Sequence, residues 1–206
     1  MIAVVDYGVG NLFSLRSSLK AIGAEAIVTS DPEVIRTAEK ILLPGVGAFA
    51  DAAAKLRESG LDRILCGEAE RGKDILGICL GMQLLFDRSY EYGEHAGLGL
   101  IPGAVVPMEG KLPPSLKIPH IGWNALHLRR MHRLLQYVKE GDCVYFVHSF
   151  YAADCEESVL ATAAYGIEVT AAVAKNNVMG CQFHPEKSGD VGLSILRAFC
   201  EKGTNT

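Results

Sequence analysis

The sequence predicts an α/β fold: an open, mostly parallel and twisted sheet flanked by helices, with extra antiparallel strands in the C-terminal half. Through residues 1–88, short apolar runs alternate with helical patterns, and such alternation implies right-handed crossovers and a parallel sheet. In residues 143–183, strand-like runs follow one another directly. The pair Asn176-Asn177 separates two of these runs and predicts a hairpin turn.

The N-terminal elements follow from hydrophobic spacing and from helix start and stop signals. Leucines at positions 12, 15 and 19 share one helical face, and Gly23 then acts as a stop. Ser30-Asp31 followed by Pro32 is a helix start signal, with the proline at the first helical position. We expect strands at residues 2–6, 25–29, 40–43 and 74–79, and helices at residues 11–22, 49–59, 61–71 and 80–88, with another helix starting at Pro32.

The C-terminal half has a different pattern. Residues 98–128 are rich in Gly and Pro and contain short strand-like pieces. Strands are expected at residues 143–150, 159–165, 168–174 and 178–183. Ser188 is the expected cap of a last helix whose apolar side chains face the core, namely Val191, Ile195, Leu196 and Phe199. Because no linker or internal repeat interrupts the chain, we expect residues 1–206 to form one domain.

Composition and charge exclude several classes of function. The net charge is −4, which gives no electrostatic reason to expect a nucleic acid or membrane partner. The six cysteines show no C-x-x-C pair and no zinc-finger spacing with histidine, and no H-x-x-x-H occurs, so no metal site is expected. The N-terminus MIAVVDYG has no basic segment and no long apolar run. We therefore expect a cytoplasmic protein with free thiols.

Three motifs follow strands of the expected parallel sheet. These are DYGVGN at residues 6–11, PGVG at residues 44–47 and the cysteine at position 79. The loops after parallel strands lie on one edge of the sheet, where ligands usually bind. We therefore expect the three motifs to lie side by side on that edge.

Cys79 stands between Gly77 and Gly81 at a strand-to-helix junction. This G-x-C-x-G pattern is the thiol version of a nucleophile elbow, a tight turn that lifts the side chain off the sheet. The helix N-terminus favours a thiolate there, and the N–H of Leu80 points to the place where an oxyanion would form. The alternative is a buried structural thiol beside a tight turn, and the pentapeptide alone does not decide between them.

The segment GCQFHPEKSG, residues 180–189, contains a possible base. His184 and Glu186 lie two positions apart at the expected end of a strand, so both side chains should point to one face. A nucleophilic cysteine needs a base, and the base needs an orienting group. His184 and Glu186 could supply these beside Cys79, whereas a structural role is expected for His95, His120, His127 and His132.

The segments GICLGMQ and QFHPEKS together resemble the class I, triad-type glutamine amidotransferases, a flavodoxin-like α/β family. PGVGAF, PHIGWN at residues 119–124 and YFVHSFY at residues 145–151 narrow the resemblance to the glutaminase subunits of imidazole glycerol phosphate synthases. The likeness covers essentially the whole chain. It implies hydrolysis of glutamine to glutamate and ammonia, without a cofactor, for histidine biosynthesis.

The resemblance also implies roles for individual residues. Cys79 would attack the glutamine carboxamide, His184 would protonate the leaving ammonia and then activate water, and Glu186 would orient His184. The oxyanion would be held by backbone groups of Leu80, Gly45, Val46 and Gly47. Substrate-binding positions would be Gln83, Glu91, His148, Ser149 and Phe150.

Released ammonia implies a partner protein. Ammonia lost to water becomes ammonium, which is not a nucleophile, and the glutaminase pattern leaves no residues for an acceptor site. The resemblance identifies the acceptor as a separate (β/α)8-barrel cyclase subunit, which would form a heterodimer with this chain. The candidate interface residues are Asn11, Trp123 and Lys187.

The PGVG turn predicts control by that partner. Val46 is β-branched and disfavours positive φ, so the resting peptide is expected to present a carbonyl rather than an N–H to the oxyanion. Partner binding would supply free energy to turn the peptide only by preferring the turned state. The alternative is a plain tight turn with constitutive activity.

Other functions stay open at this stage. The chain also fits, less well, the glutaminase of another synthase, such as those for pyridoxal phosphate, anthranilate or aminodeoxychorismate. From a different class, it fits a non-catalytic flavodoxin-like protein with a reactive thiol, although the set of Cys79, His184 and Glu186 argues against this. Nothing in the sequence indicates the extended groove of a peptidase.

Overall fold

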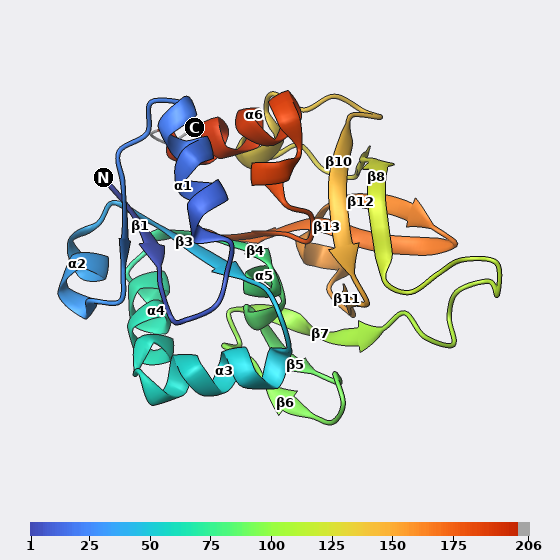
Figure 1. The fold of residues 1–206 in the computed structure, drawn as a ribbon, viewed down its shortest axis with the longest axis horizontal. Coiled ribbons are helices and arrows are strands. Elements are labelled where there is room, and N and C mark those ends of the chain that lie inside the picture. Colours follow the sequence, from blue (N-terminus) through green and yellow to red (C-terminus); the bar gives the residue numbers. More distant parts are fainter. Residues whose placement is uncertain (202–206) are drawn as a thin grey trace.

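The computed structural model describes residues 1–201, so residues 202–206 of the expected domain lie outside its description. Its main sheet has eight strands in the order β2-β1-β3-β4-β14-β13-β12-β9. Figure 1 shows β1, β3 and β4 at one end of this sheet and β13 and β12 toward the other. The first five strands in this order are parallel to one another. They are β1 (Ile2–Val5), β2 (Ala26–Thr29), β3 (Lys40–Gly45), β4 (Asp74–Cys79) and β14 (Val178–Cys181).

The other three strands of the sheet are antiparallel, as expected for the C-terminal half. They are β9 (His127–Leu128), β12 (Val159–Tyr165) and β13 (Ile167–Lys175). Asn176 has a φ of +53° in the turn between β13 and β14, a conformation that asparagine tolerates better than most residues. The expected hairpin turn is therefore confirmed.

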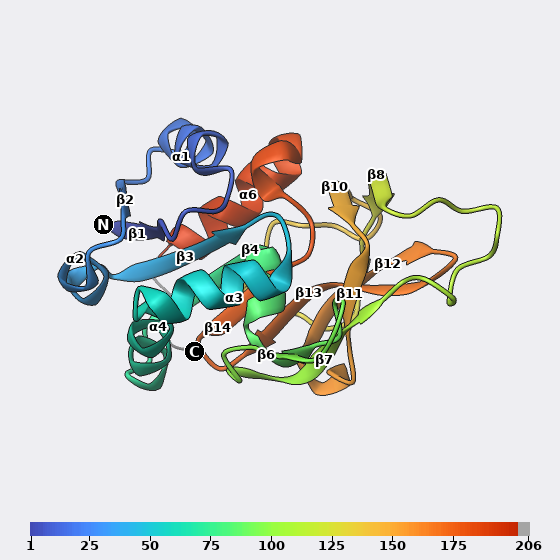
Figure 2. The same cartoon turned by 60° about the horizontal axis from the view of Figure 1, so that its bottom comes forward.

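Helices cover both faces of the sheet. Alternate residues of β1 pack on opposite sides: Ile2 and Val4 lie in one apolar cluster with α1 and α6, and Ala3 and Val5 lie in a second cluster with the other helices. Figures 1 and 2 show α1 and α6 on one face and α3 and α4 on the other. The helices are α1 (Leu12–Ala21), α2 (Pro32–Thr37), α3 (Phe49–Glu58), α4 (Leu61–Glu70), α5 (Leu80–Leu84) and α6 (Gly189–Cys200).

The start signals of α1 and α2 act as the sequence predicts. The Asn11 side chain accepts a hydrogen bond from Ser14 N at 3.3 Å, and the Asp31 side chain accepts one from Glu33 N at 2.8 Å. These contacts satisfy backbone donors that a helix start leaves free.

Ser188 does not cap α6, although it precedes the helix. Its Oγ instead donates to His184 O at 2.6 Å and accepts from Tyr145 N at 2.9 Å. The hydroxyl therefore ties the segment before α6 to a neighbouring strand, and the prediction of a side-chain cap was wrong.

The helix expected at residues 80–88 ends at Leu84. A later segment of the chain bonds to the carbonyl groups at the end of this helix. Leu98 N donates to Leu84 O, and Leu100 N donates to Leu85 O. The chain then continues as a strand of a second sheet, in the order β11-β7-β5-β6. Its strands are β5 (Phe86–Ser89), β6 (His95–Ala96), β7 (Ile101–Pro107) and β11 (Phe150–Ala153).

Strands β8 (His120–Ala125) and β10 (Cys143–His148) form an antiparallel ribbon beside the main sheet (Figure 1). The strand expected at residues 143–150 is therefore divided, because β10 ends at His148 and the chain enters the second sheet at Phe150. Short 3-10 helices are η1 (Arg133–Leu135), η2 (Glu156–Ser158) and η3 (Pro185–Lys187). Within residues 1–201, no helix is both long enough and apolar enough to span a membrane.

Candidate active site

The carboxyl ends of β1, β3 and β4 meet at one edge of the sheet. Gly45 pairs with Cys79 in the parallel register of β3 and β4. Tyr7, which follows β1, donates from its hydroxyl to Pro44 O at 2.8 Å. DYGVGN, PGVG and Cys79 thus lie together, as their positions after parallel strands predict.

Cys79 occupies a strained turn between β4 and α5. Its φ of +55° and ψ of −113° are unusual for a residue other than glycine. A Cβ on Gly81 would overlap the carbonyl oxygen of Leu43, and one on Gly77 would lie 2.6 Å from Gly81 O. Both glycines are therefore required because α5 starts in direct contact with the strands beneath it.

The Cys79 thiol is buried, with 7% of the residue exposed. Its Sγ donates to Val147 O at 3.9 Å and accepts from Gln182 Nε2 at 3.8 Å. Sulfur hydrogen bonds are long and weak compared with those between nitrogen and oxygen. The thiol is therefore held between the end of β10 and the segment that follows β14.

His184 and Glu186 form a buried pair. Their side chains are only 2% and 3% exposed, and His184 Nδ1 lies 2.8 Å from Glu186 Oε1. The other ring nitrogen, His184 Nε2, is buried and has no hydrogen-bond partner among the residues that the structure describes. Since a carboxylate only accepts hydrogen bonds, Nδ1 carries a proton and Nε2 is the nitrogen available for chemistry.

The pairing of His184 with Glu186 is as expected, but the structural reason for it is not. Strand β14 ends at Cys181, and residues Pro185–Lys187 form the 3-10 helix η3. His184 is held by its own N–H, which donates to Tyr145 O at 2.9 Å. The tight turn of η3, rather than a shared strand face, folds Glu186 back onto the imidazole.

His184 gains a proton more readily than a free histidine. Burial opposes the charge, but the neighbouring Cys79 and Glu186 outweigh it and raise the pKa of His184 to about 9. At neutral pH the imidazole is therefore protonated. Cys79 lies close enough to His184 to contribute to this shift, so the structure brings the three expected residues together.

Gln83 lies beside this group. Its Nε2 donates to Phe150 O at 3.1 Å and to Gln182 Oε1 at 3.0 Å. The backbone of Ser149 is fixed from outside the site, because its oxygen accepts from Met108 N at 3.0 Å. Gln83 and the 148–150 segment therefore lie near Cys79, as expected from the sequence.

Glu91 has a different position from the other expected substrate residues. Its Oε2 accepts a hydrogen bond from Phe49 N at 2.7 Å, so the carboxylate stabilises the start of α3. Glu91 is buried, with 9% of its surface exposed. Glu91 therefore anchors the chain where it leaves the PGVG turn and enters α3. A role of Glu91 in binding substrate stays a prediction.

The PGVG turn has one left-handed residue, Gly47, with a φ of +99°. Val46 is not among the described non-glycine residues with positive φ, and it is 40% exposed. The steric preference expected of Val46 is thus respected in this conformation. Whether the adjacent peptide presents an N–H or a carbonyl to the oxyanion stays a prediction.

Two residues that the sequence did not single out contact this site. Gln182 is fully buried between Cys79 and Gln83. Burial, followed by the charge of nearby Cys79, raises the pKa of Tyr7 well above its usual range, so the phenol stays protonated and donates to Pro44. Gln182 belongs to the motif QFHPEKS and Tyr7 to the motif DYGVGN. A single sequence does not show which residues they contact, so it does not distinguish them from other polar residues of the core.

A pair of buried histidines supports the 148–150 segment. His148 Nδ1 lies 2.8 Å from Phe150 O, so this nitrogen donates, and His148 Nε2 lies 2.9 Å from His120 Nδ1. Burial lowers the pKa of His148 to about 4, against the opposing effect of the bond to Phe150. His148 is therefore neutral at pH 7, and His120, expected to be structural, is its partner.

The three expected interface residues differ in their surroundings. Trp123 is 56% exposed, and its ring lies 6.0 Å from the Tyr145 ring. Lys187 Nζ lies 5.8 Å from the centre of the same Tyr145 ring. Asn11 caps α1, which packs against η3. Trp123 and Lys187 therefore both lie beside Tyr145, whereas Asn11 lies at the start of α1.

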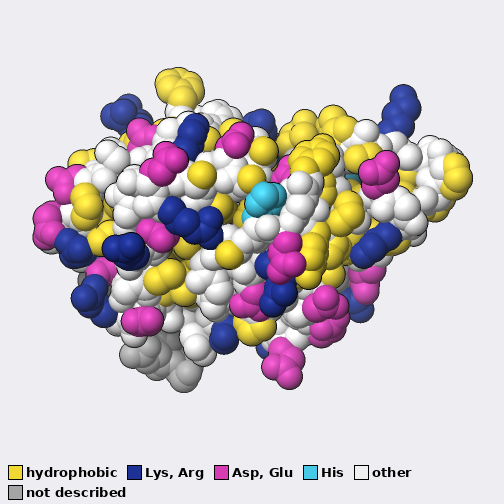
Figure 3. Space-filling view, turned by 90° about the horizontal axis from the view of Figure 1, so that it is seen from below, with side chains coloured by type: hydrophobic (Ala, Val, Ile, Leu, Met, Phe, Trp, Pro, Cys, Tyr) yellow, Lys and Arg dark blue, Asp and Glu magenta, His cyan; other side chains and the backbone are white. Residues whose placement is uncertain are grey.

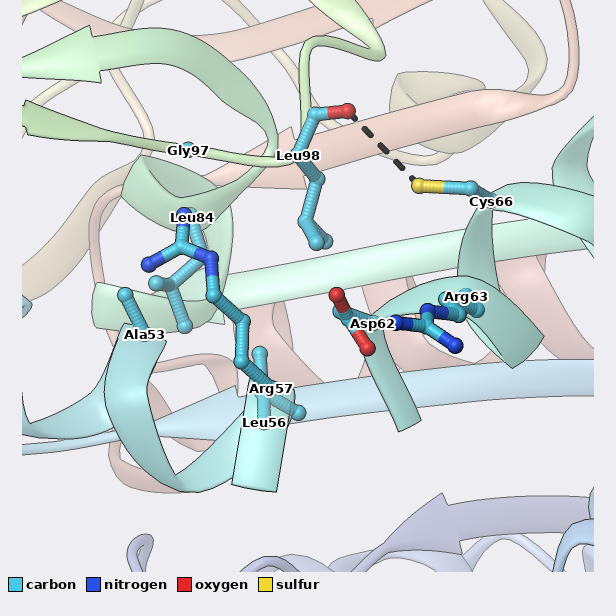
Figure 4. Close-up of a pocket in the computed structure, with 9 residues that line it drawn as sticks. All are labelled: Ala53, Leu56, Arg57, Asp62, Arg63, Cys66, Leu84, Gly97 and Leu98. Atoms are coloured by element: carbon cyan, nitrogen blue, oxygen red, sulfur yellow. Dashed lines mark hydrogen bonds between the residues drawn. The ribbon is translucent and has the colours of Figure 1, made fainter. Parts of the chain in front are cut away.

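A separate pocket of about 240 Å³ lies between α3, α4 and the end of α5 (Figure 4). None of the expected site residues lines it. Its lining consists of Ala53, Leu56, Arg57, Asp62, Arg63, Cys66, Leu84, Gly97 and Leu98. Among residues 1–201, no group of three or more His, Cys, Asp or Glu side chains is placed to hold a metal ion.

Figure 3 shows one face of the molecule. Basic and acidic side chains are interspersed over its left half, and a band of hydrophobic side chains crosses its right half. The charged side chains on this face therefore do not gather into a patch of one sign.

Comparison with known proteins identifies related sequences over nearly the whole chain. The family model for glutamine amidotransferase class-I matches residues 3–202. A relative from Wolinella succinogenes, described as imidazole glycerol phosphate synthase subunit HisH, is 46% identical over 205 residues, covering 98% of this chain and 100% of the relative. Relatives with the same description come from Bacillus cereus, 50% identical over 97% of this chain and 93% of the relative, and Methanothermobacter thermautotrophicus, 48% identical over 98% of each.

Solved structures show the same fold. A crystal structure of a glutamine amidotransferase has a TM-score of 0.75 at 20% identity, covering 97% of this chain and 99% of that chain. The structure of PurLQS from Thermotoga maritima has a TM-score of 0.74 at 22% identity, covering 96% of each chain. The expected α/β fold is therefore confirmed.

Proposed function

This chain belongs to the class I glutamine amidotransferases, close to the imidazole glycerol phosphate synthase subunits, and from that premise we propose how its residues release ammonia from glutamine. It is an enzyme of amino-acid biosynthesis, the glutaminase subunit of an imidazole glycerol phosphate synthase in histidine biosynthesis. The similarity to relatives of that description over nearly full length carries this assignment.

The proposed reaction proceeds through a thioester on Cys79. The sulfur attacks the side-chain carbonyl carbon of glutamine, the S–C bond forms, and the carbonyl electrons move onto oxygen. When the C–N bond breaks, the proton on His184 Nε2 passes to the leaving nitrogen, which departs as ammonia. Water then attacks the thioester carbonyl carbon and gives a proton to Nε2, so that a C–O bond forms. The C–S bond breaks with its electrons returning to the Cys79 sulfur, and glutamate is released.

The buried His184–Glu186 pair is the observation that supports this mechanism most strongly. The 2.8 Å contact at Nδ1 fixes the ring, and Nε2 has no hydrogen-bond partner within residues 1–201. Glu186 would hold the imidazole in one orientation and stabilise its positive charge. Cys79, in its strained turn, is the neighbouring nucleophile.

We assign the oxyanion contacts to backbone groups. Leu80 N–H, at the start of α5, would be one donor, and an N–H of the Gly45-Val46-Gly47 turn would be the second. One such donor is typically worth about 3 kcal/mol in the transition state. The bonds from Tyr7 to Pro44 and from Phe49 to Glu91 support the two ends of this turn.

Gln83, Glu91 and the backbone of residues 148–150 are the proposed contacts to the rest of the glutamine molecule. Gln83 Nε2 is occupied by Phe150 O and Gln182 Oε1. Its own Oε1 would therefore be the atom that faces the substrate amino group.

The acceptor of ammonia is proposed to be the cyclase subunit, a (β/α)8 barrel bound as a heterodimer. The relatives are described as subunits, which supports a separate partner. The ribbon near Cys79 exposes apolar side chains suited to docking, since Ile121 is 57% exposed and Trp123 is 56% exposed. Lys187 would pair with a carboxylate of the partner, and Asn11 would lie at the margin. A cytoplasmic location is part of the same proposal.

Glutamine hydrolysis by the chain alone, with the cyclase, and with the cyclase plus its nucleotide tests both the activity and its control. A stepwise rise in rate is expected if the partner turns the PGVG peptide. Equal rates under all three conditions would mean that the chain is a glutaminase whose activity the partner does not control. No hydrolysis under any of the three conditions would contradict the assigned reaction.

A further inference from the structure

Gln182 joins two parts of the active site that are distant in sequence. Its side chain is fully buried. Its Oε1 accepts from Gln83 Nε2 at 3.0 Å, and its Nε2 lies 3.8 Å from Cys79 Sγ. One amide group therefore contacts both the proposed nucleophile and a proposed substrate-binding side chain.

The orientation of this amide follows from a backbone carbonyl. Phe150 O can only accept, so Gln83 must turn its NH2 group toward it, at 3.1 Å. The same NH2 group then meets Gln182 at the acceptor oxygen, Oε1. Gln182 is left with its NH2 group facing the sulfur of Cys79, because the reverse orientation would set two NH2 groups against each other.

The two hydrogen bonds of Cys79 respond differently to loss of the thiol proton. As a thiol, Cys79 donates to Val147 O and accepts from Gln182 Nε2. A thiolate cannot donate, so the carbonyl contact becomes repulsive and the contact with Gln182 becomes a hydrogen bond to a charge. Hydrogen bonds to charged groups are stronger than neutral ones, so Gln182 favours the reactive form.

We propose that Gln182 is a positioning residue that stabilises the Cys79 thiolate through Nε2 and fixes the substrate-binding orientation of Gln83 through Oε1. This inference rests on the proposed glutaminase function. It assigns two effects to one side chain, and they can be separated because they depend on different atoms.

Two substitutions separate these effects. Gln182→Leu removes both contacts, whereas Gln182→Glu keeps an acceptor for Gln83 and replaces the NH2 group with an oxygen. Gln136→Leu is the matched control, because Gln136 is exposed and bonds to Glu201. Thermal unfolding of each variant establishes that it is folded, and Gln182→Glu, which keeps the volume, carries the test if Gln182→Leu does not fold.

The first measurement is the rate of Cys79 alkylation by iodoacetamide against pH, which needs no glutaminase activity. Gln182→Leu should move the midpoint of the profile upward by about one pH unit, the size expected for loss of a hydrogen bond to a charge. Gln182→Glu should move it further upward, because a carboxyl oxygen then faces the thiolate. Gln136→Leu should leave it unchanged. The other titratable groups that act on this site, namely His184, Glu186, Cys181 and Tyr7, are the same in all variants, and only Gln182→Glu adds a carboxyl group to them.

The second measurement is steady-state glutamine hydrolysis with the cyclase present. Gln182→Glu should lower kcat by about 10-fold or more with KM close to wild type, and Gln182→Leu should also raise KM, by about 10-fold. Folded variants with wild-type alkylation profiles and wild-type KM would overturn the proposal and leave Gln182 as packing. If the wild-type chain itself fails to hydrolyse glutamine, the proposed function fails, while the alkylation profiles still decide the contact with Cys79.

Discussion

His184 Nδ1 lies 2.8 Å from Glu186 Oε1, although the strand that precedes them ends at Cys181. The pair is formed by the 3-10 turn Pro185–Lys187, and both side chains are buried. The short turn sets the distance between two residues that are two positions apart, and the bond from His184 N to Tyr145 O anchors the turn to β10. The orientation of the imidazole therefore comes from the local turn together with this anchor.

Substitution of the pair should show unequal and non-additive losses. His184→Ala removes the proton carrier and should lower kcat for glutamine hydrolysis by about 10⁴-fold, whereas Glu186→Gln should cost about 100-fold. The double variant should resemble His184→Ala alone, because members of a catalytic unit act together. Losses that multiply in the double variant would mean that the two residues act independently.

The protonation of His184 should depend on its neighbours. Since Cys79 and Glu186 raise its pKa to about 9, its NMR titration should have a midpoint near pH 9 and move lower in Cys79→Ala. A raised pKa contributes stability that is fully present below about pH 6.5, the unfolded value, and is lost as pH rises through about 9. An unchanged midpoint in Cys79→Ala would contradict the contact between the two side chains.

His148 should make the protein sensitive to acid. Its pKa is about 4 in the folded state, so the unfolded chain binds the extra proton as pH falls below about 6.5. The stability from neutral His148 is fully present above pH 6.5 and is lost toward pH 4, by up to about 3 kcal/mol. Denaturant unfolding at pH 7 and pH 5 should show a smaller pH effect in His148→Gln than in wild type, with exposed His127→Gln as the control.

Gly81→Ala should prevent a native elbow. The added Cβ would overlap the carbonyl oxygen of Leu43 in β3, which is backbone and cannot move aside. Gly72→Ala is a suitable control, because Gly72 has a φ of +84° but open space around it, so it should cost only about 1 kcal/mol. Similar unfolding free energies for the two variants would contradict the described contact of α5 with β3.

Local patterns predicted much of the fold. The periodicity and capping signals of α1 and α2 act at the positions where they occur, since both are determined by neighbouring residues. The parallel edge that carries Cys79 follows from the order of strands and helices in the same way. These features need no knowledge of distant contacts.

Long-range contacts explain where the sequence predictions were wrong. The helix expected at residues 80–88 stops at Leu84 because residues 98 and 100 bond to its last turn. Ser188 bonds to Tyr145 instead of capping α6. Each result depends on a partner from another part of the chain, and helical spacing or a capping residue does not identify such a partner.

The residues of the candidate site also fall into two groups, those predicted from local motifs and those that only the fold identifies. Cys79, His184 and Glu186 were found from motifs whose chemistry is local to each turn. Gln182 was missed because its importance comes from contacts with Cys79 and Gln83, about a hundred positions earlier. The sequence contains the residue, but only the fold gives its two partners.

The central claim is that Cys79 releases ammonia from glutamine for use by a second subunit. Synthesis by the complex with the cyclase, measured with glutamine and then with ammonium salts, tests it most directly. Cys79→Ala should abolish synthesis from glutamine and retain synthesis from ammonium, and Cys143→Ala, at an exposed cysteine, should retain both. Normal use of glutamine by Cys79→Ala, or loss of both activities in a folded complex, would contradict the claim.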